Sequence, residues 1–225
     1  MNALIFGATG LCGRYFVEYA EKSSKISKIF TVTRRSLPQK VGPRITQLVE
    51  TDNSKWASMI PDKEINVLFT SLSTTRGAAG GFDEQYKIDH DLNIELAKAA
   101  KEKGCSTIVL VSSRGAHADS RMAYTRMKGE IERDIIALGF DHTIILRPGI
   151  LLGQRDSNGD SGFGGGIASM IGGFLYNHKR NLFKGHSVEA EDVGKVGVHL
   201  ALDEQEKVRI VESKEIIEIA EKISK

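Results

Sequence analysis

The chain has 225 residues, of which 31 are basic and 29 acidic, so its formal net charge is +2 at pH 7. The charges are scattered along the chain without a basic block, which disfavours a nucleic-acid partner. The 2 cysteines are too few for a disulfide framework, and the 6 histidines lack the spacing of a zinc site. We therefore expect a reducing compartment and no bound metal.

Apolar strands alternate with helical stretches along the chain. The expected strands are Ala3 to Phe6, Lys28 to Thr33, Ile45 to Glu50, Val67 to Ser71, Thr107 to Ser112, His142 to Arg147 and, at an edge, Val208 to Val211. The expected helices are Leu11 to Lys22, Ser54 to Ile60, Asp83 to Lys103, Ala123 to Leu138, Glu191 to Leu202 and Lys214 to Ser224. This alternation predicts an α/β fold, a Rossmann-like doubly wound parallel sheet, in a single domain over residues 1–225.

The segment from Gly153 to Lys184 breaks this alternation. It is rich in glycine and then mixes aromatic with cationic residues from Phe174 onward. We expect a small substrate lobe or lid over residues 153–184, although such a mixture is also typical of a subunit contact or an interfacial membrane contact. The apolar runs are far shorter than the ~18 residues of a membrane span, and the first strand starts at once, so we expect no cleaved targeting peptide and a soluble or peripheral protein.

The first strand runs directly into a glycine-rich turn and then a helix. Glycines at positions 7, 10 and 13 permit a tight reversal, a close backbone approach to a diphosphate and close packing of the new helix on the strand. Any strand-to-helix turn can use glycine, so the triad alone is a weak signal. We expect the dinucleotide diphosphate to be bound by Gly7, Thr9, Gly10, Leu11, Cys12 and Gly13.

Two arginines end the second strand, where an NAD-selective fold carries an acidic residue. Arg34 and Arg35 follow Thr33, and no acid appears before Glu50. Guanidinium groups bind a phosphate dianion bidentately, so the pair favours NADPH or NADP over NADH. The alternative is that both arginines are solvated at the end of the strand.

A serine, tyrosine and lysine set follows the fifth strand. Tyr124 and Lys128 are four residues apart and share a helix face, and the preceding strand ends in Ser112 and Ser113. A neighbouring ammonium favours the phenolate, so Tyr124 can exchange a proton with a substrate oxygen. We expect Ser113 to hold the substrate carbonyl and Lys128 to bind the nicotinamide ribose, which makes Ser113, Tyr124 and Lys128 the catalytic candidates. Without this context, Tyr124 would be read as a packing residue.

With these motifs, the chain resembles the atypical branch of the short-chain dehydrogenase/reductase superfamily. More narrowly, it is similar to the small fungal mitochondrial outer-membrane proteins related to the human HIV Tat-interacting oxidoreductase. The resemblance rests on the glycine turn, on Arg34 with Arg35, and on further groups of residues: Thr74 to Gly77 with Ala79 and Gly80, Ser112 with Ser113, Tyr124 with Lys128, Gly129 and Glu130, and Arg147 to Gly149. It implies NADPH binding, Tyr124 as the proton donor, Lys128 as a cofactor contact, and a location on the cytosolic face of mitochondria.

One departure concerns the segment after the fourth strand. The wider superfamily has an asparagine-rich segment there that supports a proton relay, whereas this chain has Ser71 to Thr75, so we expect an altered or absent relay. Ser71 and Leu72 are the cofactor contacts expected from this segment. By resemblance, the nicotinamide is expected beside Arg147, Pro148 and Gly149. The alternative is that these residues form a plain turn at the end of the strand.

Two classes of function fit these residues. The first is an NADPH-dependent carbonyl reductase, with a small carbonyl compound as substrate. The second is a non-catalytic protein that senses NADPH and changes its surface for a protein or membrane partner. A homodimer is among the expected assemblies, with the oligomeric state left open. The expected location is the mitochondrial outer membrane by resemblance, or the cytoplasm otherwise.

Overall fold

A computed structural model of the chain describes residues 1–62, 64–153, 187–203 and 205–224. In these residues seven parallel strands form one sheet in the order β3-β2-β1-β4-β5-β6-β9. The strands are β1 (Asn2–Phe6), β2 (Lys28–Thr33), β3 (Ile45–Val49), β4 (Val67–Thr70), β5 (Thr107–Val111), β6 (His142–Arg147) and β9 (Val208–Glu212). Each expected strand is present and ends within one residue of its expected bounds, and β9 is the expected edge strand.

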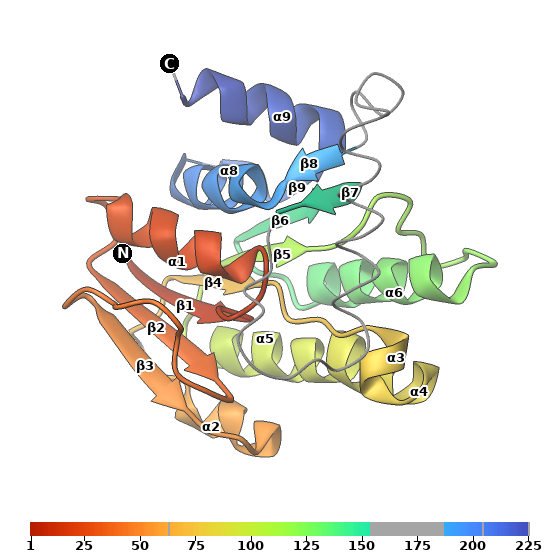
Figure 1. The fold of residues 1–225 in the computed structure, drawn as a ribbon, viewed down its shortest axis with the longest axis horizontal. Helices are drawn as coiled ribbons and strands as arrows, with labels where there is room; N and C mark the ends of the chain where they lie inside the picture. The colour runs from red at the N-terminus through yellow and green to blue at the C-terminus, as the bar shows by residue number, and fades with distance from the viewer. Residues whose placement is uncertain (63, 154–186, 204, 225) are drawn as a thin grey trace.

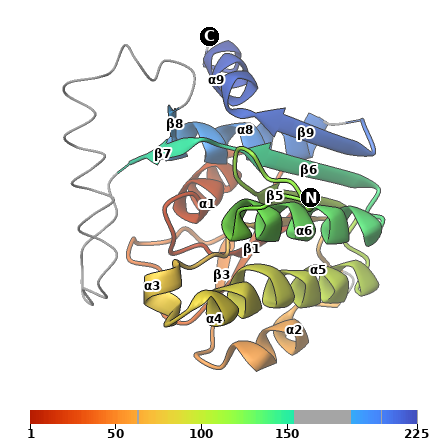
Figure 2. The same ribbon diagram turned by 90° about the vertical axis from the view of Figure 1, so that its right-hand side faces the viewer.

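Helices cover both faces of this sheet (Figures 1 and 2). One face carries α1 (Gly13–Lys22), α8 (Ala190–Asp203) and α9 (Ser213–Lys222). The other carries α2 (Trp56–Met59), which a 3-10 turn, η1 (Asn53–Lys55), precedes, together with α5 (Leu92–Glu102) and α6 (Ala123–Ala137). The doubly wound α/β fold expected from the sequence is confirmed.

Two apolar layers hold the helices to the sheet. On one face the Phe16 ring of α1 packs on Phe69 of β4, with ring centroids 5.0 Å apart. On the other, Trp56 of α2 stacks on Phe6 of β1 at 6.0 Å. The central strands are buried on both sides, which is why they read as continuous apolar runs instead of alternating ones.

The strand register aligns the carboxyl ends of the central strands at one edge. Phe6, the last residue of β1, pairs with Val32 of β2 on one side and with Thr70 of β4 on the other. The winding direction of the sheet reverses between β1 and β4. Ligands of doubly wound folds bind in the crevice at this reversal, outside the carboxyl ends of the strands.

The prediction of one long helix from Asp83 to Lys103 is wrong. The structure has α4 (Phe82–Tyr86), a wide π-helical turn, η2 (Lys87–Asp91), and then α5. A short helix, α3 (Arg76–Ala79), precedes α4 and was not expected. The extra residue in the wide turn changes which side chains face the sheet, and this alters the site described below.

A second, two-stranded sheet was also not expected. It pairs β7 (Ile150–Leu152) with β8 (Ser187–Glu189) in parallel. The expected lobe over residues 153–184 lies outside the described residues, except for Gly153 at its start, so the lobe and the single-domain organisation stay predictions. None of the described helices is long and apolar enough to cross a membrane.

Candidate functional site

The glycine turn joins β1 to α1 at the carboxyl edge of the sheet. Gly7 has a φ of +78°, and a Cβ there would lie 2.8 Å from the backbone of Ser71. Gly13 packs so closely that a Cβ would lie 2.0 Å from the carbonyl oxygen of Gly7. The Gly10 N–H donates to the same oxygen at 2.8 Å, and Gly10 is exposed. The turn thus presents the N-terminal end of α1 to the crevice, where an anion is favoured.

The segment after β4 lies against this turn. The Ser71 N–H donates to the Phe6 carbonyl oxygen at 3.2 Å. Ser71 Oγ is buried and has no hydrogen-bond partner among the described residues. An unsatisfied buried hydroxyl costs about 1–3 kcal/mol, so a polar ligand beside the turn would relieve that cost. The neighbouring Leu72 is half-buried, and its carbonyl oxygen accepts a hydrogen bond from the Asn93 amide at 3.0 Å. These features fit the dinucleotide contacts expected for both residues.

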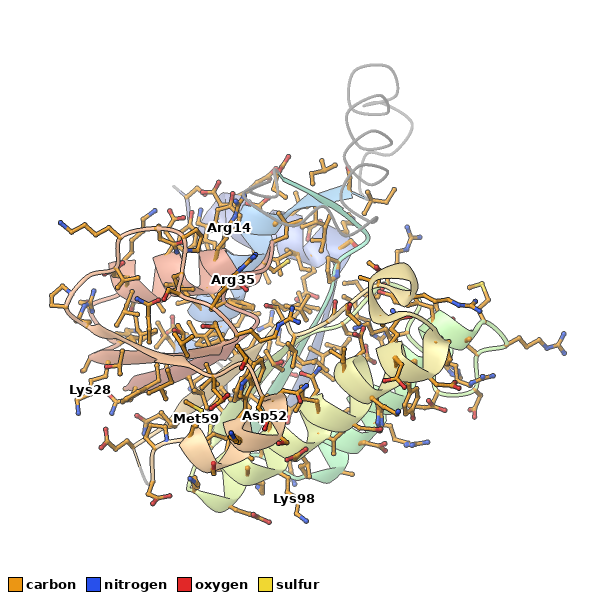
Figure 3. All side chains as sticks on the ribbon, turned by 60° about the horizontal axis from the view of Figure 1, so that its bottom comes forward. Arg14, Lys28, Arg35, Asp52, Met59 and Lys98 are labelled. Carbon is orange, nitrogen blue, oxygen red and sulfur yellow. The ribbon has the colours of Figure 1, made fainter. Side chains whose placement is uncertain are left out.

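The two arginines after β2 are exposed, next to the strand that leads into the glycine turn. The Thr33 hydroxyl donates to the Arg35 carbonyl oxygen at 2.7 Å, which fixes the backbone where the strand ends. Figure 3 shows Arg35 in the same part of the view as Arg14. Arg14 was not among the sequence candidates, although a cation directly after the last glycine of the turn is a readable signal. Its guanidinium contacts the Tyr15 ring at 4.7 Å.

The beginning of α6 is tied to the loop before it, and this positions Tyr124. The Thr125 hydroxyl donates to the Met122 carbonyl oxygen at 3.1 Å and lies 2.6 Å from Ser120 Oγ. The His117 N–H donates to the Thr125 carbonyl oxygen at 3.0 Å. Tyr124 is 46% exposed, so its phenol stays accessible at the start of a well-anchored helix.

Lys128 lies one turn further along α6 and is only 4% exposed. Its ammonium is 5.9 Å from the centroid of the Tyr124 ring and 3.2 Å from Oδ2 of Asp89, which is 1% exposed. Burial raises the pKa of Asp89 above its ordinary value, while the Lys128 ammonium and a hydrogen bond from the Thr74 N–H oppose that rise. The lysine predicted from the sequence thus has a buried carboxylate partner that sequence reasoning missed.

The wide turn η2 delivers Asp89 to this place. The Leu92 N–H donates to the carbonyl oxygen of Lys87, five residues back, which marks the inserted residue. The Asn93 amide donates to the Asp89 carbonyl oxygen at 2.9 Å and to that of Leu72 at 3.0 Å. The same Asn93 side chain accepts a hydrogen bond from the Thr70 hydroxyl at 2.5 Å. One buried asparagine therefore ties η2 to the end of β4.

The two serines after β5 have different environments. Ser112 is buried, and its hydroxyl donates to Glu132 of α6 at 2.5 Å. Ser113 is half-buried, and among the described residues its hydroxyl makes only a long contact of 3.5 Å with the Arg114 carbonyl oxygen. The Ser113 hydroxyl is therefore less engaged than that of Ser112, and the substrate contact expected of Ser113 stays a prediction.

Arg147 at the end of β6 faces carboxylates. Its Nε donates to Glu132 at 2.9 Å, a second nitrogen lies 2.5 Å from the other Glu132 oxygen, and a third lies 3.0 Å from Glu212 of β9. Pro148 is buried, and its carbonyl oxygen accepts from the Arg114 N–H at 2.9 Å; Gly149 is half-buried. The nicotinamide contact expected of Arg147, Pro148 and Gly149 stays a prediction, and the guanidinium is already held by two carboxylates.

A family model described as NAD(P)H-binding matches residues 7–204 of the chain. This span includes the glycine turn, both arginines and the tyrosine and lysine of α6. The chain belongs to this NAD(P)H-binding family, and its fold is Rossmann-like.

Relatives with high sequence identity are known from yeasts. The chain is 54% identical over 229 residues to "Protein FMP52, mitochondrial" of Saccharomyces cerevisiae, with 100% of this chain and 99% of the relative covered. It is 51% identical over 226 residues to the Candida glabrata protein of the same name, with 98% and 96% covered.

Solved structures share the fold at low sequence identity. MoeE5 in complex with UDP-glucose and NAD superposes with a TM-score of 0.68 at 16% identity, with 100% of this chain and 82% of that chain covered. A short chain dehydrogenase family protein from Francisella tularensis gives a TM-score of 0.67 at 12% identity, with 96% and 98% covered. These likenesses support the fold assignment.

Proposed function

We propose that the chain is an NADPH-dependent oxidoreductase that reduces the carbonyl group of a small molecule. The observation that carries the proposal is the geometry of α6, where an accessible phenol lies one turn from a buried, ion-paired ammonium. The ammonium of Lys128 and the ring of Tyr124 are 5.9 Å apart, which places a positive charge where it stabilises a phenolate.

The chain's own residues have separate tasks in this reaction. The chemistry that a bound nicotinamide would supply is a hydride for the carbonyl carbon. Ser113 donates a hydrogen bond to the carbonyl oxygen and holds it near Tyr124. The Tyr124 hydroxyl then gives its proton to that oxygen, which completes the alcohol, and the exposed phenolate takes a new proton from water. Lys128 stabilises the phenolate and binds ribose hydroxyl groups.

The preference for NADPH rests on Arg34 and Arg35. Both side chains are exposed beside the glycine turn, where the adenosine end of a dinucleotide lies in this fold. A 2′-phosphate carries the charge that a pair of guanidinium groups binds well, whereas the NADH ribose offers only hydroxyl groups.

The location and partners are further parts of this proposal. The relatives' names carry the word mitochondrial, which supports a mitochondrial location for this chain. The resemblance stated above extends this to the cytosolic face of the outer membrane, with a peripheral membrane contact. A small carbonyl substrate and a homodimer complete the proposal.

The test compares wild type with Tyr124→Phe in an NADPH oxidation assay against a panel of aldehydes and ketones. Loss of a general acid lowers turnover by ~10³-fold, because no group replaces the phenol proton. The NADPH dissociation constant stays within about twofold of the wild-type value, since the phenol hydroxyl adds little to binding affinity.

Tyr86→Phe is the matched control, because Tyr86 bonds Glu130 on the outside of the site and should keep normal turnover. Normal turnover by Tyr124→Phe would remove Tyr124 from the mechanism. NADPH binding without turnover of any panel member would favour the sensing protein instead.

A further inference from the structure

Several carboxylates lie on the elements around Lys128, but one of them is its ion-pair partner. On its own helix, Glu132 is engaged by Arg147 and Ser112, and Glu130 accepts from the Tyr86 hydroxyl at 3.1 Å. On the helix packed against α6, Asp91 is exposed and pairs with His90 at 2.8 Å. Among the described residues this leaves Asp89 as the carboxylate that pairs with Lys128, at 3.2 Å.

Burial sets the energetics of this pair. An ammonium on a lysine as buried as Lys128, which is 4% exposed, loses its proton readily when it has no counter-charge, because a low dielectric disfavours the charged form. A neutral lysine does not stabilise a phenolate. The charge that the proposed reaction needs on Lys128 therefore depends on the carboxylate opposite it.

Asp89 is held in place by more than its ion pair. Its other carboxylate oxygen accepts the Thr74 N–H at 2.6 Å, and its backbone carbonyl accepts the Asn93 amide. Asn93 in turn holds Leu72, which follows the buried Ser71 hydroxyl beside the glycine turn. The carboxylate is thus rigidly connected to the edge where the dinucleotide is expected.

We propose that Asp89 is a positioning residue that keeps Lys128 protonated and fixes its ammonium beneath Tyr124. An ammonium has three N–H groups, so the pair with Asp89 leaves capacity for ribose hydroxyl groups. The consequence for catalysis rests on the proposed reductase function, whereas the charge on Lys128 does not.

The test is an NMR titration of protein labelled with ¹³C at lysine Cε, with the Lys128 signal assigned by its absence in Lys128→Arg. The wild-type titration midpoint of this signal is the reference. In Asp89→Asn, which keeps the size of the side chain, the midpoint falls by about two pH units, because the buried ammonium has lost its counter-charge. Asp91→Asn, on the exposed side of the same turn, leaves the midpoint unchanged.

An unchanged Lys128 midpoint in Asp89→Asn would overturn the proposal. A double variant covers the case in which Asp89→Asn folds poorly. Asp89→Asn with Lys128→Met removes both charges, so thermal unfolding should show it to be more stable than Asp89→Asn alone. A double variant as unstable as the sum of its single variants would also overturn the proposal.

Neither readout uses NADPH or a substrate, which separates the two proposals. A lowered Lys128 midpoint in a protein that reduces nothing would leave the role of Asp89 intact and reject the reductase. The opposite pattern, normal Lys128 titration with full reductase activity in Asp89→Asn, would reject the role of Asp89 alone.

Discussion

Two ion pairs start from the same helix, one turn apart, and end in different environments. Lys128 and Glu132 are separated by four residues on α6, and each meets a partner of opposite charge. Glu132 takes hydrogen bonds from two nitrogens of Arg147 and from Ser112, and Arg147 also reaches Glu212 of β9. This network joins α6 to β6, to β9 and to Ser112, which directly follows β5.

The Lys128 pair is built differently. Among the described residues, the Lys128 ammonium contacts a single oxygen of Asp89 at 3.2 Å and the more distant ring of Tyr124. A fully bonded network rigidifies the fold around it, whereas an ammonium with unused N–H groups beside an accessible phenol can bind a ligand. The contrast teaches that burial of a charge does not by itself indicate function, and that remaining hydrogen-bond capacity is the better guide.

Of the changes that test this comparison, Glu132→Gln should have the largest effect, a loss of folding stability. The change leaves Arg147 and Ser112 facing a neutral amide that can accept fewer hydrogen bonds. Loss of one partner from a buried ion pair lowers the free energy of unfolding by about 3 kcal/mol, which urea denaturation measures.

Glu212→Gln is the matched control, because its side chain is 52% exposed and a surface partner contributes about 1 kcal/mol or less. Equal losses in the two variants would show that the Glu132 network is no stronger than a surface pair.

Arg34 and Arg35 are exposed cations, and the proposal gives them a ligand-binding role like that of Lys128. Replacing Arg34 and Arg35 together with alanine should weaken NADPH binding by about 100-fold, equivalent to ~2.7 kcal/mol, and change NADH binding by less than about threefold. Calorimetric titration of both nucleotides measures this. An equal loss for NADPH and NADH would remove the 2′-phosphate role from these two residues.

Lys128→Met should weaken NADPH binding by about tenfold, or ~1.4 kcal/mol, because methionine keeps the length of the side chain but cannot bond a ribose hydroxyl. Nucleotide protection against thermal unfolding should fall accordingly. Glu132→Gln, in contrast, should keep NADPH affinity within about twofold of wild type. If Glu132→Gln weakened NADPH binding and Lys128→Met did not, the Glu132 pair and not the Lys128 pair would be the one that binds the nucleotide.

The smallest effect is a pH dependence. Burial raises the folded-state pKa of Asp89, so the folded protein holds that proton more strongly than the unfolded chain does. Stability from this group is present below the ordinary aspartate pKa and is lost as the pH rises through the raised value.

The unfolding free energy of wild type should therefore decline relative to that of Asp89→Asn as the pH rises over this window. Urea denaturation of both proteins at several pH values measures the difference in slope. Parallel pH profiles would show that Asp89 has an ordinary pKa in the fold.

The main sheet and the tyrosine and lysine of the site could be predicted from the sequence. Central strands such as β1 and β4 are buried on both faces, so they are continuously apolar and easy to recognise. The spacing of Tyr124 and Lys128 needs only one regular helix to bring them together. The edge strand β9 was also predictable, because three of its residues, Val208, Ile210 and Val211, are β-branched.

Asp89 could not be found in this way. Its segment has the same apolar spacing as a regular helix, and the Asn93 amide that bonds the Asp89 carbonyl oxygen also reaches the Leu72 carbonyl oxygen, 21 residues earlier in the sequence. The pairing of β7 with β8 was missed for a similar reason, since strands of three residues carry almost no periodic signal. Long-range polar contacts are the part that local patterns leave open.

A crystal structure of the protein with bound NADP tests the central claim most directly. The account predicts the diphosphate on the turn from Gly7 to Gly13, the 2′-phosphate on Arg34 and Arg35, and the nicotinamide ribose within hydrogen-bond distance of Lys128 Nζ. A nucleotide bound away from the carboxyl edge of the sheet, or one whose nicotinamide end lies far from Tyr124 and Lys128, would contradict it.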